Sequence, residues 1–244
     1  MQIGPSVHRL GNGHVNAYLV EDGGEVTIVD AGLPGFWGDL PAELAAMGRS
    51  LDDVRALVLT HGHSDHVGFA ERFRVDRRIT PRIHELDAAM ARGEVKPEHQ
   101  QSGKMRIGSL VGFLLFGLRK GALRPKALTE VATFGDGATL DVPGAPRVIH
   151  TPGHSPGSAA LHFASREALL VGDAFATYAV TNGHAGPQIA PFSSDPAEAL
   201  ASLARIEGIE ARWALPGHGE PWTGGVGAAV SAVRDRVASG SPVG

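Results

Sequence analysis

One segment, Thr60–Gly68 with the sequence THGHSDHVG, constrains this chain more than any other. It follows Arg55–Thr60, whose apolar run is typical of a strand that helices bury on both faces. Three imidazoles and one carboxylate then lie within six residues, at His61, His63, Asp65 and His66. These groups suit zinc, but they can surround a cation only where the backbone turns sharply, as Gly62 permits. The segment therefore predicts a metal site where the strand ends, with a helix beginning at Ser64 or Asp65.

Three further segments have the same form, a strand that ends in a tight turn carrying a side chain able to bind metal. They are Thr151-Pro152-Gly153-His154, Val171-Gly172-Asp173 and Leu215-Pro216-Gly217-His218. Each alone is a weak signal, because a histidine after Pro-Gly is often only a turn residue. Together with the first motif, they indicate that several strand ends converge on one site.

The remaining pattern alternates strands with helices and predicts an α/β fold. A hairpin through Asp22-Gly23-Gly24 opens the chain, because this turn tolerates a positive φ. The predicted strands are Val15–Val20, Glu25–Asp30, Arg55–Thr60, Ala138–Val142, Arg147–Thr151, Ser158–Phe163, Ala168–Val171 and Arg212–Leu215. The predicted helices are Pro34–Gly48, one capped by Asp195 before Pro196, and Gly224–Ala238, with a frayed tail at 239–244. Residues 85–130 interrupt this alternation as a helical insertion, with helices around Glu85–Arg92 and Glu98–Leu118.

Composition narrows the class of protein. With 244 residues, 43% of them hydrophobic and 20% charged, the chain can bury a sizeable core, and we expect a single domain over 1–244. A net charge of −4 argues against a nucleic-acid partner. The absence of cysteine excludes disulfides and thiolate ligands. Neither a secretory signal nor an apolar run long enough for a bilayer is evident, so we expect a cytoplasmic protein without a membrane partner.

On these residues the chain resembles the metallo-β-lactamase-fold hydrolases over nearly its whole length. The resemblance rests on His61-x-His63-x-Asp65-His66, then His154, Asp173 and His218, together with Asn16–Val20 and Val29-Asp30-Ala31-Gly32. It implies a four-layer αβ/βα sandwich with the site at one edge, and two divalent cations, zinc with iron or manganese as alternatives. By the same resemblance, His61, His63 and His154 would hold the first cation, and Asp65, His66 and His218 the second. Asp173 would bridge them, and Asp30 would orient a ligand histidine, unless it is an ordinary turn carboxylate.

The resemblance implies a hydrolase in which the two metals activate a water molecule that attacks a small-molecule substrate. Asp65 would also orient the hydroxide and pass a proton to the leaving group, alongside the bridging Asp173. The oxygen-reducing branch of the family has glutamate where this chain has His63, and lactam-hydrolysing members generally lack Asp173. Ester, lactone or thioester cleavage is therefore favoured. The open alternatives are β-lactam hydrolysis, a phosphodiesterase, a mononuclear iron dioxygenase of the persulfide-oxidising type, and a non-catalytic scaffold.

The insertion suggests how a substrate could be chosen. It carries more apolar side chains than one amphipathic stripe requires, namely Leu110, Val111, Phe113, Leu114, Leu115, Phe116 and Leu118. One hypothesis is a lid in which Phe113 and Phe116 line an acyl pocket; the alternatives are packing on the core or on a second copy in a homodimer. The insertion also contains basic residues that could bind an anionic substrate tail or simply form a solvent-exposed face. They are Lys96, Lys104, Arg106, Arg119, Lys120, Arg124 and Lys126. Tyr178 and His184 are candidate donors to a substrate oxyanion.

Overall fold

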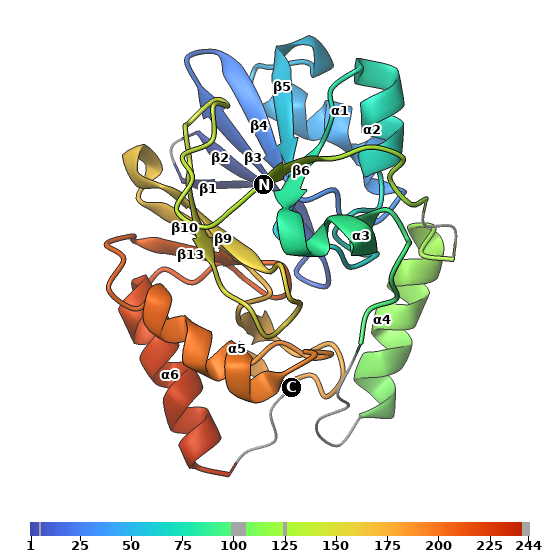
Figure 1. The fold of residues 1–244 in the computed structure, drawn as a ribbon. Coiled ribbons are helices and arrows are strands. Elements are labelled where there is room, and N and C mark those ends of the chain that lie inside the picture. The colour runs from blue at the N-terminus through green and yellow to red at the C-terminus, as the bar shows by residue number, and fades with distance from the viewer. Residues whose placement is uncertain (5, 99–105, 124–125, 241–244) are drawn as a thin grey trace.

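The amino-terminal half folds into a mixed sheet whose strands lie side by side in chain order (Figure 1). The structure is a computed structural model that describes residues 1–4, 6–98, 106–123 and 126–240. The strands of this first sheet are β1 (Gln2–Gly4), β2 (Val7–Gly11), β3 (Asn16–Asp22), β4 (Glu25–Val29), β5 (Val54–Val58), β6 (Arg82–His84) and β7 (Ala132–Phe134). The predicted hairpin joins β3 to β4, with Asp22 opposite Glu25 across the Gly23-Gly24 turn. From β4 onward the neighbouring strands are parallel.

The carboxy-terminal half contributes a second sheet in the strand order β13-β10-β9-β8. Its strands are β8 (Arg147–His150), β9 (Ala159–Phe163), β10 (Ala168–Gly172) and β13 (Trp213–Pro216), and β11 (Ala176–Tyr178) pairs separately with β12 (Ala185–Gln188). Strands β10 and β13 run parallel, with Gly172 opposite Pro216. Their carboxyl ends therefore reach the same edge of the sheet.

Helices cover the outer face of each sheet, as the four-layer sandwich requires (Figure 1). The α-helices are α1 (Phe36–Ala46), α2 (Ala70–Arg77), α3 (Ala88–Ala91), α4 (Ile107–Arg119), α5 (Pro196–Ser202) and α6 (Val226–Ala238). The short 3-10 helices are η1 (Leu51–Asp53), η2 (Glu85–Asp87), η3 (Ala164–Arg166) and η4 (Leu203–Arg205). Helix α5 begins as predicted, because the Asp195 side chain accepts hydrogen bonds from the backbone N–H groups of Ala197 and Glu198.

Alternation along the strands divides the apolar side chains among the layers. Leu19 and Leu57 face α1 and α2, whereas their neighbours Tyr18 and Val58 face the second sheet. In the second sheet, Leu170 faces the first sheet, and Leu169 faces α5 and α6. Apolar clusters therefore fill both helix–sheet interfaces and the space between the sheets, which confirms the α/β fold expected from the sequence.

Helix α4 of the predicted insertion is anchored at both ends. The Arg106 N–H donates to the Thr181 carbonyl oxygen at 2.9 Å, and the Gly35 N–H donates to that of Lys120 at 2.8 Å. Among the described residues, no helix is long and apolar enough to cross a membrane. The first predicted helix of the insertion is a 3-10 turn followed by the short α3. The start of the second, together with the tail at 241–244, lies outside the described residues.

Two sequence predictions are wrong. Helix α2 begins at Ala70 instead of Ser64 or Asp65. The preceding backbone packs on another loop, since the Gly68 N–H donates to the Gly32 carbonyl oxygen and a Cβ on Gly68 would lie 2.2 Å from that oxygen. The segment Ala138–Val142 is not a strand, because only an isolated bridge pairs its Thr139 with Arg147 of β8.

Candidate metal centre

The four ligand-type side chains of the first motif lie in the loop that follows β5. The backbone N–H groups of His66 and Val67 donate to the carbonyl oxygen of His63 at 3.0 and 3.1 Å. This turn folds the loop back so that His61, His63 and His66 are all buried. Asp65 stays partly exposed at the rim. The sharp turn expected from the sequence is therefore present.

The other three predicted side chains come from the second sheet. His154 lies in the loop between β8 and β9, Asp173 directly follows β10, and His218 follows β13. All three are buried. Because β10 and β13 are parallel neighbours, Asp173 and His218 leave the same edge of this sheet, and that edge faces the loop after β5.

Within the described residues, these side chains form three overlapping groups that could each hold a metal ion, with ligand atoms within 4.8 Å of one another. The groups are His61-His63-His154, His61-His66-Asp173 and Asp65-His66-His218. The first and last coincide with the two triads that the family resemblance implies. All seven predicted ligands are thus brought together by segments up to 157 positions apart, from residue 61 to residue 218.

Asp173 lies between the two outer triads. Its Oδ2 is 3.3 Å from His154 Nε2 and 3.2 Å from His218 Nε2, and its Oδ1 is 3.7 Å from His66 Nε2. On the outer side, His218 Nε2 is 3.4 Å from Asp65 Oδ2. A carboxylate in this position can offer one oxygen to each of two neighbouring cations.

The donor set fits divalent cations. His61 Nε2, His66 Nε2 and Asp173 Oδ1 are buried and have no hydrogen-bond partner among the described residues. Such atoms are costly to bury unless a partner satisfies them. Imidazole nitrogens and carboxylate oxygens are the ligands that zinc and the neighbouring transition metals accept. The cluster therefore has both the composition and the unsatisfied atoms expected of a metal centre.

Asp30 supports two of the histidines from beneath. Its Oδ2 accepts a hydrogen bond from His66 Nδ1 at 2.9 Å and another from the Thr60 hydroxyl at 2.8 Å. The Thr60 oxygen in turn accepts from His61 Nδ1 at 3.0 Å. With their Nδ1 atoms engaged, both imidazoles present Nε2 to the centre. Asp30 has a positive φ of 64°, which aspartate tolerates better than most residues.

The histidines of the second sheet are oriented in the same way. His154 Nδ1 donates to the Ser193 hydroxyl at 3.2 Å, and that hydroxyl donates to the Ala190 carbonyl oxygen at 2.8 Å. His218 Nδ1 donates to the backbone carbonyl oxygen of His14. Outer hydrogen bonds of this kind fix the tautomer and direction of ligand histidines.

Asp87 ties two ligand loops together. The carboxylate is fully buried and accepts hydrogen bonds from the Gly62 N–H at 2.8 Å, the Ser155 hydroxyl at 2.6 Å and the Gly157 N–H at 2.6 Å. Gly62 lies between His61 and His63, and Ser155 follows His154. Sequence analysis missed Asp87, Thr60 and Ser193. Only the aspartate, inside the apolar stretch Leu86–Ala91, left a signal that could have been noticed.

Burial and the neighbouring charged groups shift the pKa values of the histidines in the cluster. Burial, together with the neighbouring imidazoles, holds the pKa of His61 well below its usual range. Burial would also lower the pKa of His66, but the carboxylates of Asp30 and Asp173 outweigh it and raise this pKa to about 10. Burial is likewise outweighed at His218, where Asp173 raises the pKa to about 9. Because a cation binds the neutral imidazole, loading the centre would release protons from His66 and His218.

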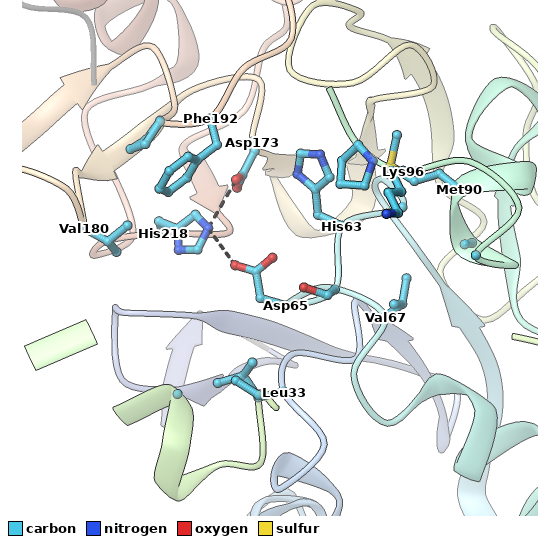
Figure 2. A pocket seen from close by; sticks show the side chains of 18 of the residues that line it. Leu33, His63, Asp65, Val67, Met90, Lys96, Asp173, Val180, Phe192 and His218 are labelled. Atoms are coloured by element: carbon cyan, nitrogen blue, oxygen red, sulfur yellow. Dashed lines mark ion pairs between the residues drawn. The ribbon is translucent and has the colours of Figure 1, made fainter. Parts of the chain in front are cut away.

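A cavity of about 570 Å³ opens over the cluster, and His63, Asp65, His154, Asp173 and His218 form part of its wall (Figure 2). The rest of the wall is mainly apolar and comes from α3, α4 and the loops around them. Its larger apolar members are Leu33, Val67, Met90, Val95, Phe113, Leu114, Leu118, Leu123, Val180 and Phe192. The ligand side chains therefore border a space large enough for a small organic substrate.

The four substrate residues suggested by the sequence fall in different places. Phe113 lines the cavity, as the lid hypothesis requires. Phe116 is not among the lining residues; its ring packs 6.3 Å from that of Phe36 and 5.4 Å from that of His14, measured between centroids. Tyr178 borders a separate hollow of about 410 Å³, and His184 belongs to neither lining among the described residues. The geometry gives no support for Tyr178 or His184 as oxyanion donors.

Comparison with known proteins agrees with this geometry. A family model described as the metallo-beta-lactamase superfamily matches residues 10–218. The chain is 28% identical over 207 residues to the probable metallo-hydrolase YybB of Bacillus subtilis (strain 168), covering 84% of this chain and 81% of that protein. It is 27% identical over 235 residues to the probable metallo-hydrolase YflN of the same organism, covering 89% and 85%. A match to the uncharacterized protein YobT, 29% identical over 163 residues, spans 66% of this chain and 62% of the relative, less than two thirds of its length.

Solved structures share the same architecture. The metallo-beta-lactamase family protein TTHA1429 from Thermus thermophilus is 25% identical, with a TM-score of 0.68 over 96% of this chain and 80% of that one. TTHA1623, solved in a di-iron-bound form, is 26% identical, with a TM-score of 0.63 over 93% and 97%. The match to the family model includes all seven residues of the cluster. The chain belongs to the metallo-beta-lactamase superfamily.

Proposed function

We propose that this chain is a binuclear, zinc-dependent hydrolase that cleaves an ester, lactone or thioester. The observation that carries the proposal is the convergence of seven ligand-type side chains, several with unsatisfied buried atoms, on the wall of an apolar cavity. In this proposal His61, His63 and His154 hold one cation, Asp65, His66 and His218 hold the other, and Asp173 bridges them. The relatives named as probable metallo-hydrolases support the reaction class.

Two bound cations would lower the pKa of a shared water molecule and polarise the substrate carbonyl. The two aspartates of the centre then differ in what they can do. The Asp173 side chain is 2% exposed and faces three histidines, so it can only hold and bridge cations. The Asp65 side chain is 23% exposed and lines the cavity. Because its Oδ2 faces His218, its Oδ1 is the atom available to accept a proton and pass it to the leaving oxygen or sulfur.

The apolar wall supports an acyl substrate. Phe113 and Leu118 of α4 face the cavity, so an aliphatic or aromatic group would be shielded from water beside the reacting carbonyl. Apart from the centre, the polar side chains of the lining are Ser64, Lys96 and Lys126, which suits one small substrate better than a polymer with many polar groups. This arrangement favours a small ester, lactone or thioester over a nucleic acid.

Zinc is proposed because five of the seven candidate ligands are histidines and two are aspartates, and zinc accepts imidazole and carboxylate ligands. Iron and manganese accept the same ligands, and a relative of 26% identity was solved in a di-iron-bound form. The metal is therefore the part of the proposal that direct analysis must determine first.

The test is elemental analysis of the purified chain combined with a hydrolysis panel of aryl esters, lactones, thioesters, lactams and phosphodiesters. We expect two zinc ions per chain and turnover of at least one of the first three classes. The double variant H154A/D173N should lose metal and activity together, whereas H162Q, which removes an imidazole from β9 outside the cluster, should lose neither. One iron per chain with dioxygenase activity, or turnover of lactams or phosphodiesters alone, would overturn the proposal.

A further inference from the structure

The fold separates the basic residues of the insertion, which look alike in the sequence. Lys120 forms an ion pair with Asp39, with 2.5 Å between Nζ and Oδ2. Arg106 and Arg119 are exposed and do not line the cavity. Lys96 and Lys126, by contrast, both belong to the wall of the cavity over the metal centre. Lys104 and Arg124 lie outside the described residues.

The two cavity lysines come from adjoining segments. The Leu128 N–H donates to the Ala91 carbonyl oxygen at 2.9 Å, and a Cβ on Gly93 would lie 3.1 Å from that of Ala127. These contacts bring the chain just before Lys96 beside the chain just after Lys126, and both lysines line the cavity. Figure 2 shows the Lys96 side chain beside Met90, on the side of the pocket where His63 lies.

Among the described residues, no carboxylate is paired with either of these two ammonium groups. In the described part of the chain, neither lysine has an ion pair or a side-chain hydrogen bond. The acidic residues of the lining are Asp65 and Asp173, and both belong to the metal centre, where two divalent cations would outweigh them. With both cations bound, the mainly apolar cavity would therefore carry a net positive charge, which favours a bound anion.

We propose that the substrate is an amphiphilic anion, an acyl compound whose apolar body lies along α4 and whose carboxylate, phosphate or sulfate group is held by Lys96 and Lys126. This inference rests on the proposed function, because the scissile carbonyl is placed at the metal centre. The apolar body packs on Val95, Phe113 and Leu118. The lysines remain hydrated at the rim, so they select the anion by charge without the penalty of burying an unpaired ammonium group.

Binding can be tested independently of turnover with two fluorescent probes that share one skeleton. 1-Anilinonaphthalene-8-sulfonate carries an anionic group, and N-phenyl-1-naphthylamine lacks it. With the metal-loaded full chain, we expect the double variant K96M/K126M to weaken sulfonate binding roughly tenfold, as the loss of two solvent-exposed ion pairs implies, and to leave binding of the neutral probe unchanged. The variant R106M/R119M removes the same charge from the two ends of α4, outside the cavity, and should change neither affinity.

A matched pair of leucines tests whether the probes occupy the cavity. Leu118 lines it and is 53% exposed, whereas Leu115 does not line it and is 52% exposed. L118Q should weaken both probes, and L115Q should weaken neither. Equal effects of L118Q and L115Q would place the probes on the open face of α4. Equal effects of K96M/K126M and R106M/R119M would show that the sulfonate probe responds only to the net charge of the protein. Either result would overturn the inference.

A kinetic comparison separates this inference from the proposed function. The mono-4-nitrophenyl ester of a medium-chain dicarboxylic acid has a free carboxylate, and its methyl diester does not. We expect K96M/K126M to raise KM for the free acid roughly tenfold, with kcat and the kinetics of the diester unchanged. Hydrolysis of both esters with equal KM would sink the inference and leave the proposed function standing. Failure of the wild-type chain to hydrolyse any ester, lactone or thioester would sink the proposed function, and the probe titrations would still measure anion selection.

Discussion

Replacing Asp87 with alanine should damage both the stability of the fold and its affinity for metal. The carboxylate is fully buried and accepts three hydrogen bonds, from the Gly62 and Gly157 amides and the Ser155 hydroxyl. Each buried hydrogen bond to a charged group contributes about 1.5 to 3 kcal/mol, and such contributions are not additive within one network. We therefore expect D87A to lower the free energy of unfolding by about 4 kcal/mol.

The same change releases two ligand loops. Without the carboxylate, the Gly62 N–H, beside His61 and His63, loses its hydrogen-bonded link to Ser155 and Gly157 in the loop that carries His154. Loss of comparable outer hydrogen bonds weakens metal binding roughly 10- to 100-fold. D87N should show a smaller loss of stability, about 2 kcal/mol, because its amide keeps one acceptor oxygen. The loss that remains arises because the amide NH₂ group would face a hydrogen-bond donor.

Urea denaturation measures the stability, and competition with a chromophoric chelator measures the zinc affinity. The matched control is D76A, which removes a carboxylate 43% exposed on α2 and paired with Arg72, and should change the free energy of unfolding by less than about 0.5 kcal/mol. If D87A unfolds within about 1 kcal/mol of the wild type and binds zinc as tightly, Asp87 does not hold the loops together and the reasoning is refuted.

Three further predictions follow from contacts described in the structure. Hydrogen bonds from Arg74, with those from Thr129, lower the pKa of Glu71 from 4.5 to about 2, so their stabilisation is present above pH 4.5 and is lost as the pH falls toward 2. E71Q should therefore reduce the free energy of unfolding at pH 7 by about 1 to 2 kcal/mol. At pH 2 the free energies of unfolding of E71Q and the wild type should differ by less, which urea denaturation at both pH values would measure. D30N should weaken zinc binding roughly 10- to 100-fold in chelator competition, because both carboxylate oxygens of Asp30 accept hydrogen bonds, Oδ1 from the Thr60 N–H and Oδ2 from His66 and the Thr60 hydroxyl, whereas an amide has one acceptor oxygen; an unchanged affinity would exclude this role. G217A should lose metal in elemental analysis, since its Cβ would lie 2.3 Å from Asp173 Oδ1 and 2.4 Å from His66 Cε1, whereas G38A, with open space at that position, should retain it.

The candidate ligand set could be predicted from the sequence because its signals are local. Each ligand follows a strand and a turn that the residues themselves specify, as at Gly62 and at the Pro-Gly pair before His218. Periodicity likewise predicted the hairpin and the helix capped by Asp195. The position of the site at one edge then follows from where the parallel strands end.

The errors and omissions arise from contacts between distant residues. The start of α2 depends on Gly68 packing against Gly32, which no local propensity reports. Asp87 lies 68 positions from Ser155, so its role appears only after the two sheets are assembled. In the same way, nothing in the sequence separates Lys96 from Lys120, because only the fold turns one toward the cavity and the other toward Asp39.

The positions of the candidate ligands bear on how the protein would assemble around bound metal. Four of them follow β5 of the first sheet, and His154, Asp173 and His218 follow strands of the second. A cation bound by residues of both sets would link the two halves of the molecule. Capture of metal is therefore expected late in folding, once the halves have docked, and neither half should retain it alone. Free zinc would then raise the melting temperature in proportion to the logarithm of its concentration. A chelator would weaken the packing between the two sheets before it destabilised either sheet by itself.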